Sequence, residues 1–152
     1  MPVAGFTVAP LDSGHRTDWG ALFAAYADFY ESRQDAAMRE RVWGWLTDPG
    51  HELDGLIALD SDGRGIGLVH YRPFVRPLAA STGGFIDDLF VAPAWRGSGV
   101  AEALVEAVVQ EGRRRGWSVV RWITAESNAR ARAFYARVAD ETAWVTYQIP
   151  LV

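Results

Sequence analysis

The residues with the clearest potential for chemistry form a strand, a loop and a helix in the second half of the chain. A β-prone apolar run, Phe85–Val91, leads through the glycine-bearing loop Arg96–Gly99 into the strongest helical pattern, Val100–Arg115. Backbone N–H groups converge in such a loop, and the helix start adds about half a positive charge. The pattern favours a cradle for a pyrophosphate, although a tight strand-to-helix connection that binds nothing would show the same pattern.

Other kinds of phosphate-binding loop do not fit this stretch. A Walker loop ends in Gly-Lys-Ser/Thr, whereas the 15 lysine and arginine positions of this chain are all arginine. A dinucleotide fingerprint needs a third glycine where Glu102 stands. Gly97 and Gly99 would let the backbone approach a pyrophosphate closely, and Ala101 leaves the first helical turn unobstructed.

Acidic and basic side chains nearby are candidates for moving a proton. Asp87 and Asp88 are neighbours on the strand, so we expect their side chains on opposite faces, with one of them facing the substrate. His70 is a further candidate base, although a lone histidine is more often structural. Whether Asp87, Asp88, His70 or water acts as the base stays open. The absence of cysteine excludes a cysteine acyl-enzyme, and Ser98, which lacks a neighbouring base, is interpreted as a loop spacer.

A mixed sheet is needed to position these residues. Hydrophobic periodicity and turn signals predict strands at Phe6–Leu11, Leu53–Leu59, Gly65–Tyr71, Phe85–Val91, Val119–Thr124 and Trp144–Ile149. The predicted helices are Asp18–Tyr30, Asp35–Leu46, Val100–Arg115 and Asn128–Arg137, with Asp18 as a candidate cap. Arg72–Gly84, with two prolines and two adjacent glycines, is predicted to be an exposed loop. The order indicates a single α/β or α+β domain over residues 1–152.

Composition limits the partners. No histidine and carboxylate cluster has metal-ligand spacing, no apolar run could span a bilayer, and no basic patch suggests nucleic acid. We therefore expect a cytoplasmic protein without a metal, a membrane or nucleic acid as partner. Acidic residues outnumber arginines before Gly84, and the net charge is −4, which favours a cationic partner. Trp19, Trp43 and Trp45 are expected in the core, or alternatively in an aromatic cage for an alkylammonium group.

The loop and a later helix resemble a known family. Arg96–Ala101 matches the Arg/Gln-x-x-Gly-x-Gly/Ala signature of GNAT acetyltransferases, and Asn128–Tyr135 is similar to the family's Asn-x-x-Ala-x-x-Phe/Leu-Tyr helix. Asp88–Val91 and the ending Tyr147–Leu151 also look like the subgroup of small polyamine, histone and amino-acid acetyltransferases. The chain departs from the family at Ala143-Trp144, where Gly-Phe is frequent. The resemblance implies a GNAT-like mixed, mostly antiparallel sheet flanked by about four helices.

The resemblance also implies a co-substrate and a set of site residues. Acetyl-CoA is expected to bind, with main-chain groups around Leu89 and Val91 holding its pantetheine arm. Tyr135 is the expected general acid for the departing thiolate, with a core tyrosine as the alternative, and Asp88 or Asp87 would act on the amine. The expected cofactor-binding residues are Leu89, Phe90, Val91, Arg96, Gly97, Ser98, Gly99, Val100, Ala101, Asn128 and Tyr135. Asn128 is also placed to cap its helix.

The implied function is transfer of an acetyl group from acetyl-CoA to the primary amine of a polyamine, an amino acid or a similar small molecule, by direct attack in a ternary complex. A non-catalytic acyl-CoA sensor and a protein lysine or N-terminal acetyltransferase are the alternatives. A homodimer is expected, because the uncharged strand Trp144–Ile149 is a poor exposed sheet edge and related members associate through this end.

Overall fold

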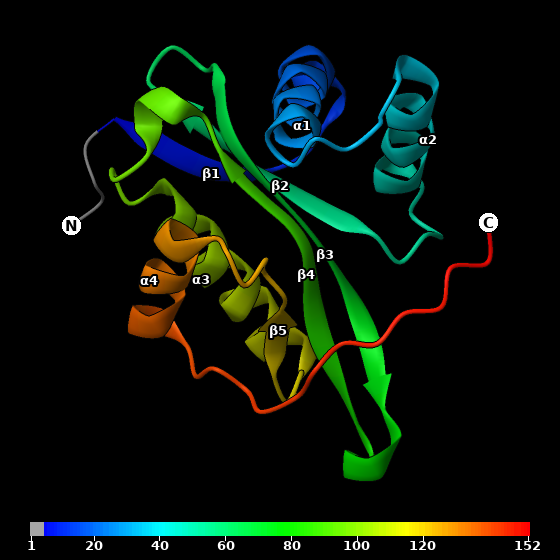
Figure 1. The fold of residues 1–152 in the computed structure, drawn as a ribbon. Helices are drawn as coiled ribbons and strands as arrows, with labels where there is room; N and C mark the ends of the chain where they lie inside the picture. The colour runs from blue at the N-terminus through cyan, green and yellow to red at the C-terminus, as the bar shows by residue number, and fades with distance from the viewer. Residues whose placement is uncertain (1–4) are drawn as a thin grey trace. The chain divides into compact units, whose positions relative to one another are not determined.

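A computed structural model describes residues 5–152 in two compact units, residues 5–122 and residues 123–152 (Figure 1). The first unit contains the strands β1 (Phe6–Pro10), β2 (Asp54–Asp60), β3 (Gly65–Arg76), β4 (Ser81–Val91) and β5 (Val120–Trp122), and the helices α1 (Arg16–Phe29), α2 (Ala36–Thr47) and α3 (Val100–Arg115). The second unit contains α4 (Ala129–Val138). Residues 1–4, which the single-domain prediction includes, lie outside the described residues.

The five strands form one sheet in the order β1-β2-β3-β4-β5. The first four strands pair antiparallel with their neighbours, and β5 pairs parallel with β4. The central strand β3 is buried from Ile66 to Tyr71 because helices cover both faces of the sheet there. The prediction of a mixed, mostly antiparallel sheet with about four helices is confirmed.

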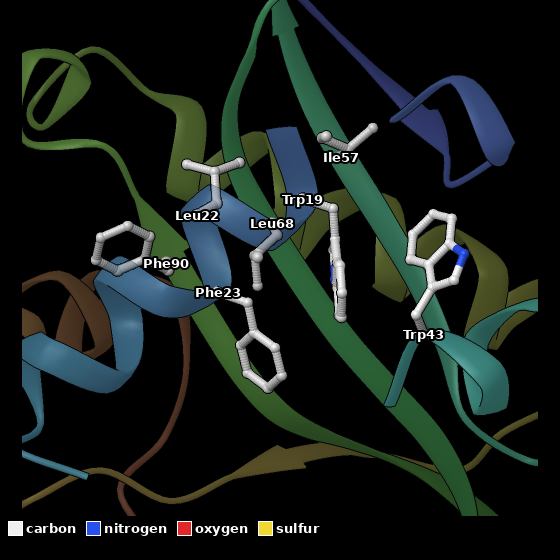
Figure 2. Packing of buried hydrophobic residues seen from close by; sticks show 7 residues of the cluster. All are labelled: Trp19, Leu22, Phe23, Trp43, Ile57, Leu68 and Phe90. Carbon is white, nitrogen blue, oxygen red and sulfur yellow. The ribbon is translucent and has the colours of Figure 1, made fainter. Parts of the chain in front are cut away.

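Helices α1 and α2 lie on one face of the sheet and α3 lies on the other (Figure 1). Successive residues of β3 show this division, because Leu68 belongs to the hydrophobic cluster of Trp19, whereas Gly67 lies against Leu104 of α3. Figure 2 shows the cluster on the α1 and α2 face, whose buried members are Trp19, Leu22, Phe23, Trp43, Ile57, Leu68 and Phe90.

The two N-terminal helices begin differently from one another. Asp35 caps α2 as its position predicts, and its carboxylate accepts the N–H of Met38 at 2.8 Å. The prediction that Asp18 caps α1 is wrong, because α1 begins at Arg16, one turn earlier than the cap would require. The carboxylate of Asp18 instead accepts the N–H of Gly65 at 2.8 Å. This bond fixes the start of β3 against α1.

The segment Arg72–Gly84 is not the exposed loop that its prolines and glycines suggested. β3 continues to Arg76 and β4 starts at Ser81, so the segment forms a long hairpin with a short turn between the strands. Pro73 is tolerated because the ladder to β2 ends at Tyr71, which leaves β3 with a partner on one side only. Gly84 is required, because the Trp117 indole lies where a Cβ would stand.

In the second unit, the prediction of a strand at Trp144–Ile149 is wrong. The segment after α4 pairs with no strand of the described chain, and the large apolar side chains of Trp144, Tyr147 and Ile149 are exposed. Its composition favours a strand, but a strand also needs a neighbouring backbone to bond with. The pattern of residues 144–149 contained no information about that neighbour.

Candidate active site

A β-bulge in β4 organises the candidate site. Along the hairpin, His70 pairs with Asp88 while the next residue, Tyr71, pairs with Ile86, so Asp87 is an extra residue in β4. An extra residue breaks the alternation of side chains between the two faces of a strand. Asp87 contacts Arg72 and Asp88 contacts His70, and these two partners lie on the same face of β3. The prediction that Asp87 and Asp88 point to opposite faces is therefore wrong.

Asp88 is held by a buried hydrogen-bond chain. Its Oδ2 lies 2.8 Å from Nδ1 of His70, and Nε2 of His70 lies 2.9 Å from Nε1 of Trp19. His70 and Trp19 are fully buried, whereas about a quarter of the Asp88 side chain is exposed. Leaving a buried polar group without a partner costs about 1–3 kcal/mol, so both nitrogens of His70 need these bonds.

His70 is consequently a poor candidate for the base that deprotonates a substrate. Both ring nitrogens already have partners, and the side chain has no exposed surface. A base must lie within hydrogen-bond reach of the proton that it takes. Of the candidates considered from the sequence, the two carboxylates of the bulge meet this requirement better, because both are partly exposed.

Asp87 forms its own ion pair. Its Oδ2 accepts the Nε–H of Arg72 at 2.9 Å. Burial raises the pKa of the Asp87 carboxyl, although the hydrogen bond from Arg72 opposes this effect. Arg72 was not predicted to contribute to the site, since it was assigned to a loop. The signal that could have found it is its spacing of two residues from His70, which places both side chains on one face of a strand.

The main chain of β4 becomes an open edge after the bulge. The parallel ladder with β5 covers only Gly84–Ile86, and no other strand of the described chain pairs with this side of β4. The Ala92 N–H donates to the Ile66 carbonyl at 2.8 Å. In an antiparallel pair, every second residue bonds to the neighbouring strand and the residues between point the other way. By this alternation the N–H and C=O groups of Leu89 and Val91 point away from β3, toward the open edge.

The loop between β4 and α3 has the backbone that its glycines predict. Gly97 and Gly99 have φ values of 79° and 92°, in the left-handed region that other residues rarely adopt. Gly99 is the N-cap of α3, and as a glycine it has no side chain that could cap the helix. A Cβ at Gly97 would meet no atom within 4 Å. The N–H groups of Val100 and Ala101 at the start of α3 are therefore placed to bind an external anion.

Two loop side chains brace the loop itself. The guanidinium of Arg96 lies 5.2 Å from the ring centroid of Phe29 and 5.7 Å from that of Phe90, and its Nε donates to the Val91 carbonyl at 3.3 Å. The Ser98 hydroxyl donates to the carbonyl of Trp95. This bond agrees with the interpretation of Ser98 as a loop spacer.

Two predicted site residues belong to the second unit. Asn128 caps α4 as predicted, and its side-chain oxygen accepts the N–H of Ala131 at 3.3 Å. Tyr135 follows about two helical turns later, and its ring lies 5.2 Å from that of Phe134. The contributions of Asn128 and Tyr135 to cofactor binding and catalysis stay predictions.

The tryptophans do not form an aromatic cage in the first unit. Trp19 and Trp43 pack against one another in the core with ring centroids 5.0 Å apart. Trp45 is partly exposed and stacks on His51. Core packing, the first interpretation from the sequence, is correct for Trp19 and Trp43.

Two further findings concern metals and membranes. Within residues 5–152, no group of three or more histidine, cysteine, aspartate or glutamate side chains is arranged to hold a metal ion. In the same part of the chain, no helix combines the length and the apolar character that crossing a membrane requires.

An open strand edge beside a helix start is an arrangement suited to an extended, phosphate-bearing substrate. Residues 19–139 match the model of the acetyltransferase (GNAT) family. The chain therefore belongs to this family and is an acetyltransferase. The match spans α1 to α4 and contains the bulge and the loop before α3.

Individual relatives are similar at moderate identity. The chain is 28% identical over 131 residues to the D-amino-acid N-acetyltransferase HPA3 of Saccharomyces cerevisiae, covering 86% of this chain and 81% of that protein. It is 29% identical over 125 residues to the aminoglycoside N(6')-acetyltransferase type 1 of Stenotrophomonas maltophilia, covering 74% of each. Its fold is similar to that of the aminoglycoside N-acetyltransferase AAC(6')-Iy in complex with CoA, with a TM-score of 0.80 at 22% identity, covering 100% of this chain and 99% of that one.

Proposed function

We propose that this chain transfers the acetyl group of acetyl-CoA to the primary amine of a small molecule, by direct attack in a ternary complex. The observation that carries the proposal is the open edge of β4 at Leu89 and Val91. Along the chain, this edge stands between the carboxylate of Asp88 and the glycine loop that begins α3. In this order along the chain, the carboxylate offers a place for an amine, the open edge for the pantetheine arm of acetyl-CoA, and the glycine loop for its pyrophosphate.

The residues present fit acetyl-CoA. The start of α3, where Gly99 leaves the N-cap without a side chain, and the positive-φ residues Gly97 and Gly99 would bind the pyrophosphate through N–H groups. The outward N–H and C=O of Leu89 and the outward N–H of Val91 would bind the amide-containing arm as an added strand, while the Val91 carbonyl accepts from Arg96. The side chains of Phe90 and Val100 are buried and would support this backbone from the core. Arg96 would act mainly by bracing the loop, since its guanidinium lies against the rings of Phe29 and Phe90.

Acetyl-CoA supplies an activated thioester, whose C–S bond breaks as the new C–N bond forms and whose sulfur leaves with the electron pair. Asp88 would bind the incoming ammonium group and take a proton from it, directly or through water, so that the nitrogen lone pair is free to attack. An N–H at the open edge would donate to the carbonyl oxygen as negative charge develops there. Tyr135 would donate its phenolic proton to the departing sulfur and regain one from solvent. The remaining proton of the amine leaves to solvent as the amide forms.

The acceptor is proposed to be a small amine. Next to the Asp88 and His70 pair lies a group of rings: Phe23 is 4.9 Å from His70, and Tyr26 is 5.8 Å from Phe90 and 6.2 Å from Phe23 between ring centroids. A carboxylate beside aromatic rings suits a short alkylammonium. The names of the two curated relatives, which refer to D-amino acids and aminoglycosides, support the same class.

The proposal includes one domain and a homodimer. The family match crosses from the first unit into the second, which supports treating residues 1–152 as one domain. The exposed apolar side chains of Trp144, Tyr147 and Ile149 support a second copy as the partner of the C-terminal segment. Light scattering at micromolar concentrations tests the dimer, and a monomer mass throughout that range would contradict it.

The experiment that tests the proposed function is acetyl-CoA consumption with a panel of amines, followed by mass spectrometry of the products. We expect a mass gain of one acetyl group on a primary amine and an equal amount of free CoA thiol. Saturable acetyl-CoA binding without turnover on any amine would favour the acyl-CoA sensor instead.

A further inference from the structure

The chain of hydrogen bonds from Trp19 to Asp88 has a definite direction. The indole Nε1 of Trp19 can only donate, so Nε2 of His70, 2.9 Å away, must accept. A neutral imidazole carries its proton on the other nitrogen, which makes Nδ1 the donor to Oδ2 of Asp88 at 2.8 Å. The two bonds together fix both the orientation and the tautomer of His70.

The environment of His70 keeps this arrangement in place. His70 and Trp19 have no exposed surface. The ring of Phe23 approaches His70 edge-on at 4.9 Å, and Trp19 packs on Trp43 with ring centroids 5.0 Å apart. A ring flip of His70 would place Nδ1 and Nε2 away from both partners. The imidazole is therefore a rigid support between α1 and β4.

The buried imidazole holds one of the two oxygens of the Asp88 carboxylate. Oδ2 is engaged by His70, and no described residue donates a hydrogen bond to Oδ1. About a quarter of the side chain remains exposed. A carboxylate that is held at one oxygen and open at the other presents that second oxygen in a fixed direction. Asp87 lacks this support, since its partner Arg72 is itself partly exposed.

We propose that His70 is a positioning residue, which holds the Asp88 carboxylate toward the amine acceptor and is itself fixed by Trp19. The proposal rests on the proposed function, because it gives Asp88 an amine to bind. It does not make His70 a catalytic residue, since the imidazole touches no reacting atom. Its effect is on the orientation of Asp88 in the complex with the amine.

Two substitutions at position 70 separate positioning from packing. His70→Leu fills the space but removes the donor to Asp88, and we expect kcat/KM for the amine to fall about 10- to 100-fold, the range for a hydrogen bond to a charged group. His70→Asn keeps an N–H donor near the position of Nδ1 and should recover most of that loss. The KM for acetyl-CoA should stay within about twofold of the parent in both variants. Ile57→Val, in the same core cluster, is the control for a change in packing alone and should leave kcat/KM unchanged.

A spectroscopic measurement tests the same arrangement in the parent protein, even where His70→Leu does not fold. Long-range ¹H–¹⁵N spectra should show a neutral His70 ring with the proton on Nδ1. A proton on Nε2 would overturn the proposal, as would a His70→Leu variant as active as the parent, or equal losses in His70→Leu and His70→Asn. If the parent acetylates no amine, the proposed function fails and this role fails with it. If the parent is active and His70→Leu equals it, only the role of His70 fails.

Discussion

The side chains of Asp87 and Asp88 lie on one face of the sheet, although the two residues are neighbours in β4. Their supports differ, because Asp88 is held by a fully buried imidazole and Asp87 by a partly exposed guanidinium. We therefore expect Asp88→Asn to lower kcat/KM for the amine about 100-fold, the usual scale for loss of a proton-transferring group, and Asp87→Asn to lower it less. Steady-state kinetics of the two variants with one amine check this order. A larger loss of kcat/KM in Asp87→Asn would show that Asp87, and not Asp88, acts on the amine.

The glycine at the start of α3 should determine cofactor affinity. Gly99→Glu places a carboxylate where a pyrophosphate is proposed to bind, so calorimetry should show strongly weakened acetyl-CoA binding. Gly116→Glu is the matched control, because Gly116 caps the other end of α3 with φ 77° against 92° for Gly99. Both substitutions strain the backbone alike. Equal acetyl-CoA affinity in the two variants would contradict the proposed pyrophosphate site.

Tyr135→Phe should separate turnover from binding. Loss of the phenolic proton should lower kcat about 100-fold if Tyr135 alone protonates the departing sulfur, with acetyl-CoA affinity nearly unchanged. Tyr147→Phe, in the same unit, is the control for removal of a hydroxyl group. Rapid-quench and steady-state rates check the effect. A Tyr135→Phe variant that turns over at the parental rate would reduce Tyr135 to a packing residue.

The far end of α3 offers a test of the fold by pH. A hydrogen bond from Arg114 is the largest cause that lowers the pKa of Glu111 from 4.5 to about 2, with Arg115 adding to it against the opposing effect of burial. Because the pKa is lower in the folded state, Glu111 contributes stability above about pH 4.5 that is lost as the pH falls toward 2. Arg115 also binds Asp54 at 2.7 Å, which fixes α3 to the start of β2.

Glu111→Gln should accordingly lower the free energy of unfolding at pH 7, and the difference from the parent should shrink as the pH falls below 4. Urea titrations of Glu111→Gln and the parent at pH 7 and below pH 4 measure the difference in the free energy of unfolding. Glu106→Gln, on the same helix with an exposed arginine 3.9 Å away, is the control and should change little. A difference between Glu111→Gln and the parent that stays constant with pH would show that the ion pair does not stabilise the fold.

The sequence alone predicted the strand, loop and helix from Phe85 to Arg115, because each signal there is local. Strand residues, turn glycines and helix periodicity need no distant partner to be interpreted. The bulge at Asp87 was not predictable in this way, because it depends on the register between β3 and β4. The same limit explains the hairpin at Arg72–Gly84, where Pro73 is tolerated only because β2 has already ended.

The hydrogen bonds that support Asp88 could not be predicted from the sequence either. Trp19 and His70 are 51 residues apart, and their contact depends on α1 crossing the face of β3. Trp19 alone suggested core packing or an aromatic cage, and His70 alone suggested a structural histidine or a candidate base. At Trp144–Ile149 the local pattern was sufficient for a strand, but the structure provides that segment with no neighbouring strand in the described chain.

The central claim is acetyl transfer from acetyl-CoA to a small amine, and one comparison of kcat/KM tests it most directly. Spermidine, free D- and L-amino acids and an aminoglycoside should be compared with a lysine-rich peptide at saturating acetyl-CoA. We predict that at least one small amine is acetylated with release of free CoA thiol, at a kcat/KM above that of the peptide. A peptide preferred by more than about tenfold, which is roughly 1.4 kcal/mol in transition-state binding, would contradict the account, and so would turnover on none of these amines.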